Sequence, residues 1–179
     1  MRRLYSVVLS SCLFVSALSA QATPYVPSTD LPNGRQILAI YLGANSCGPC
    51  HNPAVKEAVH AMKVLVATQA RNTGASFDAI GVANDWDPRE AASFLADSGP
   101  FDQLVLGGNF TNLAFEQFVW RDPNGKAAMP QIVIVQRTVK PGSTAISISE
   151  SRILRRILGI EEIAAWVKQG APISPSIKP

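Results

Sequence analysis

Hydrophobic residues occur along the chain in short runs, and the spacing within each run predicts the element it forms. The continuous apolar run with branched residues at 37–43 is typical of a strand that is buried on both faces, and residues 77–83 predict a second buried strand. Further strands are predicted at 103–108 and 131–135. The alternating residues 144–149 predict a strand with one face in water.

Helices are predicted between these strands. Segment 52–70 has apolar residues at helical spacing on one face. They are Val55, Val59, Met62 and Val66. A second helix begins after Asp87, an N-cap residue that is followed by Pro88 at the first helical position and by Glu90 to complete a capping box. A third helix is predicted at 160–170, and residues 112–120 have a short apolar face.

Strands that alternate with helices predict an α/β layered sheet. The 179 residues, of which 47% are hydrophobic and 16% charged, suit one globular domain, and we assign it to residues 37–170. Residues 23–36 hold three prolines and no periodicity, which predicts an extended N-terminal segment over the surface. The proline-rich residues 171–179 predict a disordered tail.

The first residues are typical of a secretory signal peptide. Arg2 and Arg3 precede an apolar run, and Ala20-Gln21-Ala22 supplies the small residues of a cleavage site, so that residues 1–22 would be removed. A membrane anchor is the alternative, but the apolar run is short for a span. We therefore expect a periplasmic or secreted protein.

The charge balance gives no indication of nucleic-acid binding. The full chain has a formal charge of +3, and without residues 1–22 it keeps 14 basic and 13 acidic side chains, a charge of +1. No basic run remains in that part, so we expect no nucleic-acid partner.

Removal of residues 1–22 takes away Cys12 and leaves two cysteines, Cys47 and Cys50. In an exported protein a disulfide between them can persist. A disulfide that closes so short a loop contributes little to the stability of the fold. The pair joins a predicted strand to a predicted helix, and a helix start favours a thiolate. This placement indicates Cys47 as the attacking sulfur and Cys50 as the resolving one.

Two segments resemble the thioredoxin superfamily. Ser46-Cys47-Gly48-Pro49-Cys50 after a buried strand resembles its active site, and "AAMPQIVIV" resembles its cis-proline segment, with Met129 and Pro130 as substrate-docking residues. The order of elements is similar to the TlpA-like periplasmic branch. The resemblance implies a thioredoxin-like fold with a central mixed β-sheet flanked by helices, and a cis Met129–Pro130 bond.

The same resemblance implies an exported thiol:disulfide oxidoreductase that acts as a reductase on protein thiol or disulfide substrates, with a membrane electron donor and no cofactor. The chain departs from the family six residues before the first cysteine, where Tyr41 replaces a buried acid. Tyr41 and His51 are therefore the candidates for tuning the pKa of the thiols, although Tyr41 also suits simple core packing and His51 simple solvation.

Two other interpretations stay open. Cys47-Gly-Pro-Cys50-His51 matches the attachment pattern of c-type haem, although that reading needs a distal ligand and a small helical fold. A non-catalytic binding module on the same scaffold is the second. A zinc site needs four ligands, and His51 and His60 are the only histidines, so we expect no metal.

Overall fold

A five-stranded mixed sheet forms the centre of the protein, with the strand order β3-β2-β1-β4-β5. The computed structural model describes residues 23–123 and 125–173. Strands β1, β2 and β3 are parallel, whereas β4 runs antiparallel to both β1 and β5. The strands are β1 (Gly34–Gly43), β2 (Ser76–Ala83), β3 (Gln103–Leu106), β4 (Gln131–Pro141) and β5 (Ile146–Leu158).

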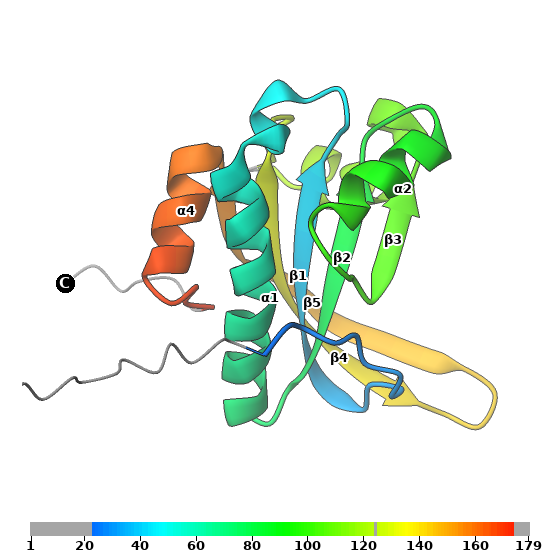
Figure 1. The fold of residues 1–179 in the computed structure, drawn as a ribbon. Coiled ribbons are helices and arrows are strands. Elements are labelled where there is room, and N and C mark those ends of the chain that lie inside the picture. The colour runs from blue at the N-terminus through cyan, green and yellow to red at the C-terminus, as the bar shows by residue number, and fades with distance from the viewer. Residues whose placement is uncertain (1–22, 124, 174–179) are drawn as a thin grey trace, which may run out of the picture.

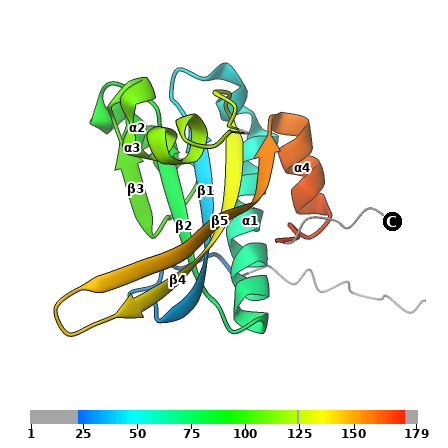
Figure 2. The same cartoon turned by 180° about the vertical axis from the view of Figure 1, so that it is seen from behind.

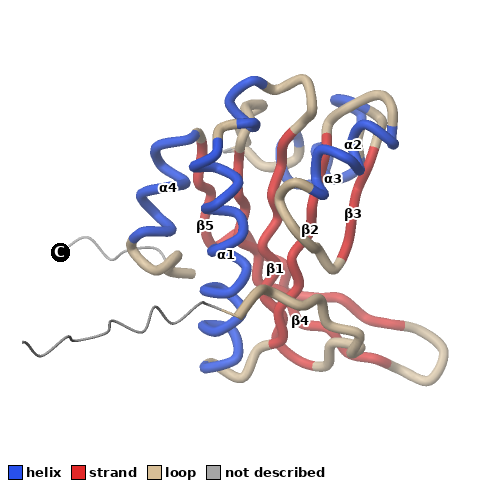
Figure 3. The backbone as a smooth tube through the Cα atoms, in the orientation of Figure 1, coloured by secondary structure: helices blue, strands red, loops and turns tan. Residues whose placement is uncertain are grey.

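Helices cover both faces of this sheet. Helices α1, α2 and α4 lie in front of it in Figure 1, and α3 lies on the opposite face, which Figure 2 shows. The tube in Figure 3 shows the alternation of strand and helix that the sequence predicts. The helices are α1 (Pro53–Asn72), α2 (Pro88–Ala96), α3 (Leu113–Phe115) and α4 (Ile160–Lys168), with the short turns η1 (Gly48–His51), η2 (Asn109–Thr111) and η3 (Glu116–Trp120).

Two hydrophobic cores, one on each face, hold the layers together. The larger core lies under α1 and α4, and the predicted apolar face of α1 is confirmed, because its four residues are fully buried there. The second core joins β1, β2 and β4 to α3 and η3. Leu113 does not belong to it: 75% of this residue is exposed, whereas Phe115, Phe118 and Val119 are buried.

Strands β4 and β5 run further than their apolar patterns predict. Strand β4 runs to Pro141, beyond the predicted segment 131–135, and β5 runs to Leu158, beyond the predicted segment 144–149. The two strands pair as a hairpin that projects from the sheet in Figure 1. Pairing irregularities interrupt the alternation of inward and outward side chains, and Glu150 has a left-handed φ of 54°. Backbone pairing rather than burial maintains the outer part of this hairpin, because residues 144–149, which were predicted to have one face in water, are exposed at every position.

The two ends of the described chain pack on the domain. Tyr25 in the extended N-terminal segment donates a hydrogen bond to Asp102 and packs its ring edge-on against Phe77. At the other end Ala171 is buried and the Ile173 N–H donates to a side chain of α1, 3.3 Å away. The predicted disordered tail is therefore ordered at 171–173, since these residues are held by polar contacts.

The predicted signal peptide, residues 1–22, and the rest of the predicted tail, residues 174–179, lie outside the described residues. Within the described ranges, no helix combines the length and the apolar character needed to cross a membrane.

A lysine is buried at the side of the larger core. Lys63 of α1 has no exposed surface, and its Nζ donates to the carbonyl oxygens of Ser98 (2.6 Å) and Pro100 (2.9 Å). The same Nζ lies 4.2 Å from the centre of the Phe101 ring. Burial lowers the pKa of Lys63 from 10.5 to about 8, while the charge of Asp102 acts in the opposite direction. Lys63 thus ties the turn between α2 and β3 to α1.

We expect the stability of the protein to rise with pH through Lys63. Between the folded pKa of about 8 and the unfolded value of 10.5, the unfolded chain binds more protons at this site, so raising the pH relieves the cost of the buried charge. Relative to Lys63→Met, the free energy of unfolding should increase by on the order of 1 kcal/mol across this range. Denaturant titrations at several pH values measure it, with the exposed Lys140→Met as control. Parallel pH profiles for wild type and Lys63→Met would contradict the expectation.

Candidate functional site

The two cysteines lie beyond the C-terminal end of the central strand β1, at the end of the sheet where the parallel strands finish. Strand β1 ends at Gly43, and η1 begins at Gly48 and contains Cys50. Cys47 and Cys50 form a disulfide with an S–S distance of 2.10 Å. Cys47 is partly exposed, whereas Cys50 is completely buried. A reagent from solution therefore has access to one sulfur of the pair and not to the other.

Cys47 occupies the N-cap position of η1. Its Sγ accepts a hydrogen bond from the backbone N–H of Cys50, 3.2 Å away. Pro49 lies in the first turn of η1 and has no N–H that would need a partner. An N–H group directed at Sγ would stabilise a thiolate at Cys47.

A buried carboxylate holds the loop before Cys47. Asp85, the second residue after β2, is 6% exposed and accepts the N–H of Asn45 at 2.9 and 3.0 Å and that of Ser46 at 3.3 Å. No motif in the sequence indicated Asp85. The available signal was its place, an acid two residues after a buried strand parallel to the one that leads to the cysteines.

His51 also contacts the loop before Cys47, through the carbonyl group of Asn45. Its Nε2 lies 2.7 Å from the carbonyl oxygen of Asn45, and because a carbonyl oxygen only accepts, Nε2 carries the proton of this bond. The imidazole also contacts the ring of Phe94 edge-on at 5.5 Å. His51 thus fixes the backbone next to Cys47, and its predicted effect on the thiol pKa stays a prediction.

Tyr41 lies in the larger core, completely buried, and stacks on Phe94. Burial raises the pKa of its hydroxyl, which therefore stays protonated. Among the described residues this hydroxyl has no hydrogen-bond partner. A Cβ at Gly43 would come within 2.9 Å of it, which accounts for a glycine at the end of β1. Because its hydroxyl is already protonated, Tyr41 cannot act as the proton acceptor for a thiol.

The Met129–Pro130 bond is cis, which confirms the expectation from the sequence. Met129 and Pro130 line a groove together with Pro49, the residue before Cys50. Met129 also packs on the same core as Cys47 and Cys50. The structure thus brings the predicted docking residues and the predicted redox residues to one side of the molecule.

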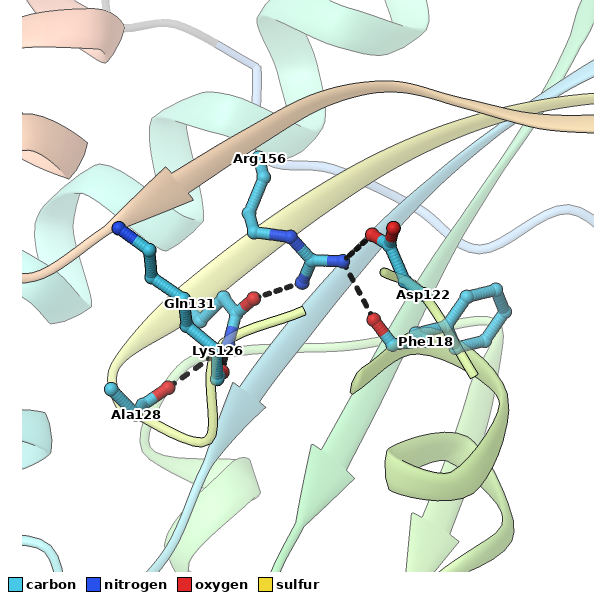
Figure 4. A network of polar contacts seen from close by, with 6 residues as sticks. All are labelled: Phe118, Asp122, Lys126, Ala128, Gln131 and Arg156. Carbon is cyan, nitrogen blue, oxygen red and sulfur yellow. Dashed lines mark hydrogen bonds and ion pairs between the residues drawn. The ribbon is translucent and has the colours of Figure 1, made fainter. Parts of the chain in front are cut away.

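A polar network holds the chain on both sides of Pro130 (Figure 4). The guanidinium of Arg156 on β5 donates to the carboxylate of Asp122, to the Gln131 side chain and to the carbonyl of Phe118, the last at 2.7 Å. The Gln131 amide in turn donates to the carbonyls of Lys126 (3.0 Å) and Ala128 (2.9 Å).

The members of this network are shielded from water. The side chains of Arg156 and Asp122 are 13% and 14% exposed, and Gln131 is fully buried. Because Gln131 directly follows Pro130, the network ties the docking residues to the edge strand β5. No local pattern in the sequence links these three residues to the site, so none of them was predicted there.

No group of three or more histidine, cysteine, aspartate or glutamate side chains within residues 23–123 and 125–173 could hold a metal ion. Comparison of the chain with protein-family models, with curated proteins and with solved structures found no match.

Loss of the Asp85 carboxylate should loosen the cysteine loop. Asp85→Ala leaves the N–H groups of Asn45 and Ser46 without their acceptor, which should lower the free energy of unfolding by about 1–3 kcal/mol. Amide hydrogen exchange at these two residues should become faster. Asp87→Ala, which removes the N-cap of α2 in the same segment, is the control and should leave both amides protected. Unchanged exchange in Asp85→Ala would contradict the bracing role.

Loss of the Arg156 guanidinium should cost more than an exposed arginine does. Arg156→Met removes the donor from three acceptors in a shielded network, so the free energy of unfolding should fall by about 3 kcal/mol. Arg156→Lys should recover only part of this, because an ammonium cannot reproduce the planar fork. Arg152→Met, at an exposed position of the same strand, should change it by less than about 0.5 kcal/mol. Equal losses for Arg156→Met and Arg152→Met in denaturant titrations would refute the assignment.

Proposed function

We propose that this protein is a thiol:disulfide oxidoreductase of the thioredoxin superfamily that exchanges its Cys47–Cys50 disulfide with protein thiols. The observation that carries the proposal is the asymmetry of the disulfide. Cys47 is partly exposed and its sulfur accepts an N–H at the start of η1, whereas Cys50 is buried. This is the arrangement that a nucleophilic and a resolving thiol require.

The reaction follows from this geometry. In the reductive direction the Cys47 thiolate attacks a substrate disulfide, forms a mixed disulfide, and releases the first substrate thiol. The Cys50 thiol loses its proton and attacks Cys47, which frees the second substrate thiol and closes the Cys47–Cys50 bond. Two electrons pass from the protein to the substrate, and two protons accompany them. The reverse sequence oxidises a substrate dithiol.

The fold supports the thioredoxin-like assignment. Its mixed sheet places β1 centrally, the cysteines follow β1, and Met129–Pro130 precedes the antiparallel neighbour β4. The resemblance to the TlpA-like branch favours a reductase that a membrane electron donor keeps reduced. The signal-like residues 1–22 favour a periplasmic or secreted location.

Two observations favour this function over the haem alternative. Thioether attachment would need both sulfurs to face a macrocycle, whereas Cys50 is enclosed in the core. The His51 Nε2 that would ligate iron is hydrogen-bonded to the Asn45 carbonyl. Reduction of insulin by the purified protein, compared with Cys47→Ser, distinguishes the enzyme from a binding module on the same scaffold.

The two cysteines should trap substrates differently. Cys50→Ser keeps the attacking sulfur and loses the resolving one, so mixed disulfides with the natural partner should accumulate on non-reducing gels after expression in the periplasm. Cys47→Ser should trap none, and the double Cys47→Ser/Cys50→Ser variant is the control. Adducts with Cys47→Ser alone would reverse the assigned roles, and equal trapping by both single variants would reject the mechanism.

A further inference from the structure

A groove of about 490 Å³ runs beside the disulfide, between η1 and the start of α4. Pro49, Met129 and Pro130 form one side of it, and Leu158, Ile160 and their neighbours form the other. The two sides are tied together, because the N–H of Gly159 donates to the carbonyl oxygen of Pro130 at 2.9 Å. Pro49 lies between Cys47 and Cys50 in the chain, so the groove reaches the segment that carries the disulfide, although neither cysteine lines it.

The charges on this groove have a single sign. Its eight lining residues include two acids, Glu161 and Glu162, and no lysine, arginine or histidine. Both acids are exposed in the first turn of α4. One carboxylate oxygen of Glu162 accepts the N–H of Leu158 at 3.2 Å. Within the described ranges, neither acid forms an ion pair.

We propose that this groove receives a positively charged, extended segment on the substrate protein, next to the cysteine that reacts with Cys47. The inference rests on the proposed function and adds the class of substrate to it: partners with lysine or arginine beside the reactive cysteine. Glu161 and Glu162 are the residues that determine this preference.

The chemistry of the groove suits a long cationic side chain. The methylene stem of lysine or arginine packs on apolar surface while its charged head stays in water, and the apolar lining meets two exposed carboxylates here. Charges at such a rim raise the rate of encounter and reject partners of like charge, and salt weakens both effects. The acids also stabilise the N-terminus of α4 through the helix dipole, but that effect does not discriminate between substrates.

The test follows the first exchange step alone. Reduced Cys50→Ser is mixed with single-cysteine peptides whose sulfur carries a neutral thiopyridyl group and whose cysteine is flanked by lysines, serines or glutamates. The Cys47 thiolate attacks the peptide sulfur, the sulfur–thiopyridyl bond breaks, and thiopyridone leaves with the electron pair and takes a proton from water. Released thiopyridone gives the second-order rate constant, and mass spectrometry confirms the Cys47–peptide disulfide.

The lysine peptide should react about fivefold faster than the glutamate peptide at low ionic strength, with the serine peptide between them. High salt should reduce this ratio. Glu161→Gln/Glu162→Gln in the same background should bring the ratio close to one. Glu90→Gln is the matched control, an exposed acid in the first turn of α2, and should keep the ratio.

The outcomes separate the two proposals. A ratio that is near one in the starting protein, or that the double glutamine variant does not change, overturns the groove inference and leaves the proposed function intact. Release no faster than with Cys47→Ser/Cys50→Ser overturns the proposed function, and the inference falls with it. Thermal unfolding of the glutamine variants shows any loss of α4 stability separately from the charge preference.

Discussion

The pairing of β1 with β2 on one side and with β4 on the other is the constraint on which the site depends. β1 is buried over most of its length and makes a parallel ladder and an antiparallel ladder at once. Because β2 runs parallel to β1 and β4 runs antiparallel to it, the chain leaves β1 and β2 and enters β4 at the same end of the sheet. The cysteine loop, Asp85 and Met129–Pro130 are therefore neighbours although the sequence separates them widely.

Apolar packing supplies the sheet and the large helices, but buried polar groups position the loops of this protein. Asp85 holds the backbone before Cys47, Arg156 and Gln131 hold the chain around Pro130, and Lys63 holds the turn after α2. Each is largely or fully shielded from water and has backbone carbonyl or N–H partners. Each of these side chains pairs with backbone groups of one loop conformation, and another conformation would leave the shielded polar side chain without its partners.

Local patterns predicted much of this structure. The helix of Val55 and Met62 and the strand before the cysteines follow from apolar spacing, and the cis Met129–Pro130 bond followed from the family resemblance. The full length of β4 and β5 could not be predicted. The outer part of β4 is polar and is maintained by pairing with β5, and the inner part of β5, residues 152–158, has three arginines among its apolar residues and no strict alternation. The roles of Asp85 and Arg156 were also out of reach, since each acts through residues far along the chain and the sequence shows no spacing that joins them.

The irregular pairing in β5 has a consequence for how copies of this protein meet in a crowded solution. β5 is an edge strand of 13 residues, and its exposed Ile146 and Ile148 would suit the start of an intermolecular sheet. The left-handed residue Glu150 interrupts its row of backbone donors and acceptors, and the charge of Arg152 stands next to the break. Bulges and charges of this kind are the devices by which natural sheets avoid edge-to-edge aggregation. The bulge and the charge therefore work against pairing of the projecting hairpin with the edge strand of a second copy.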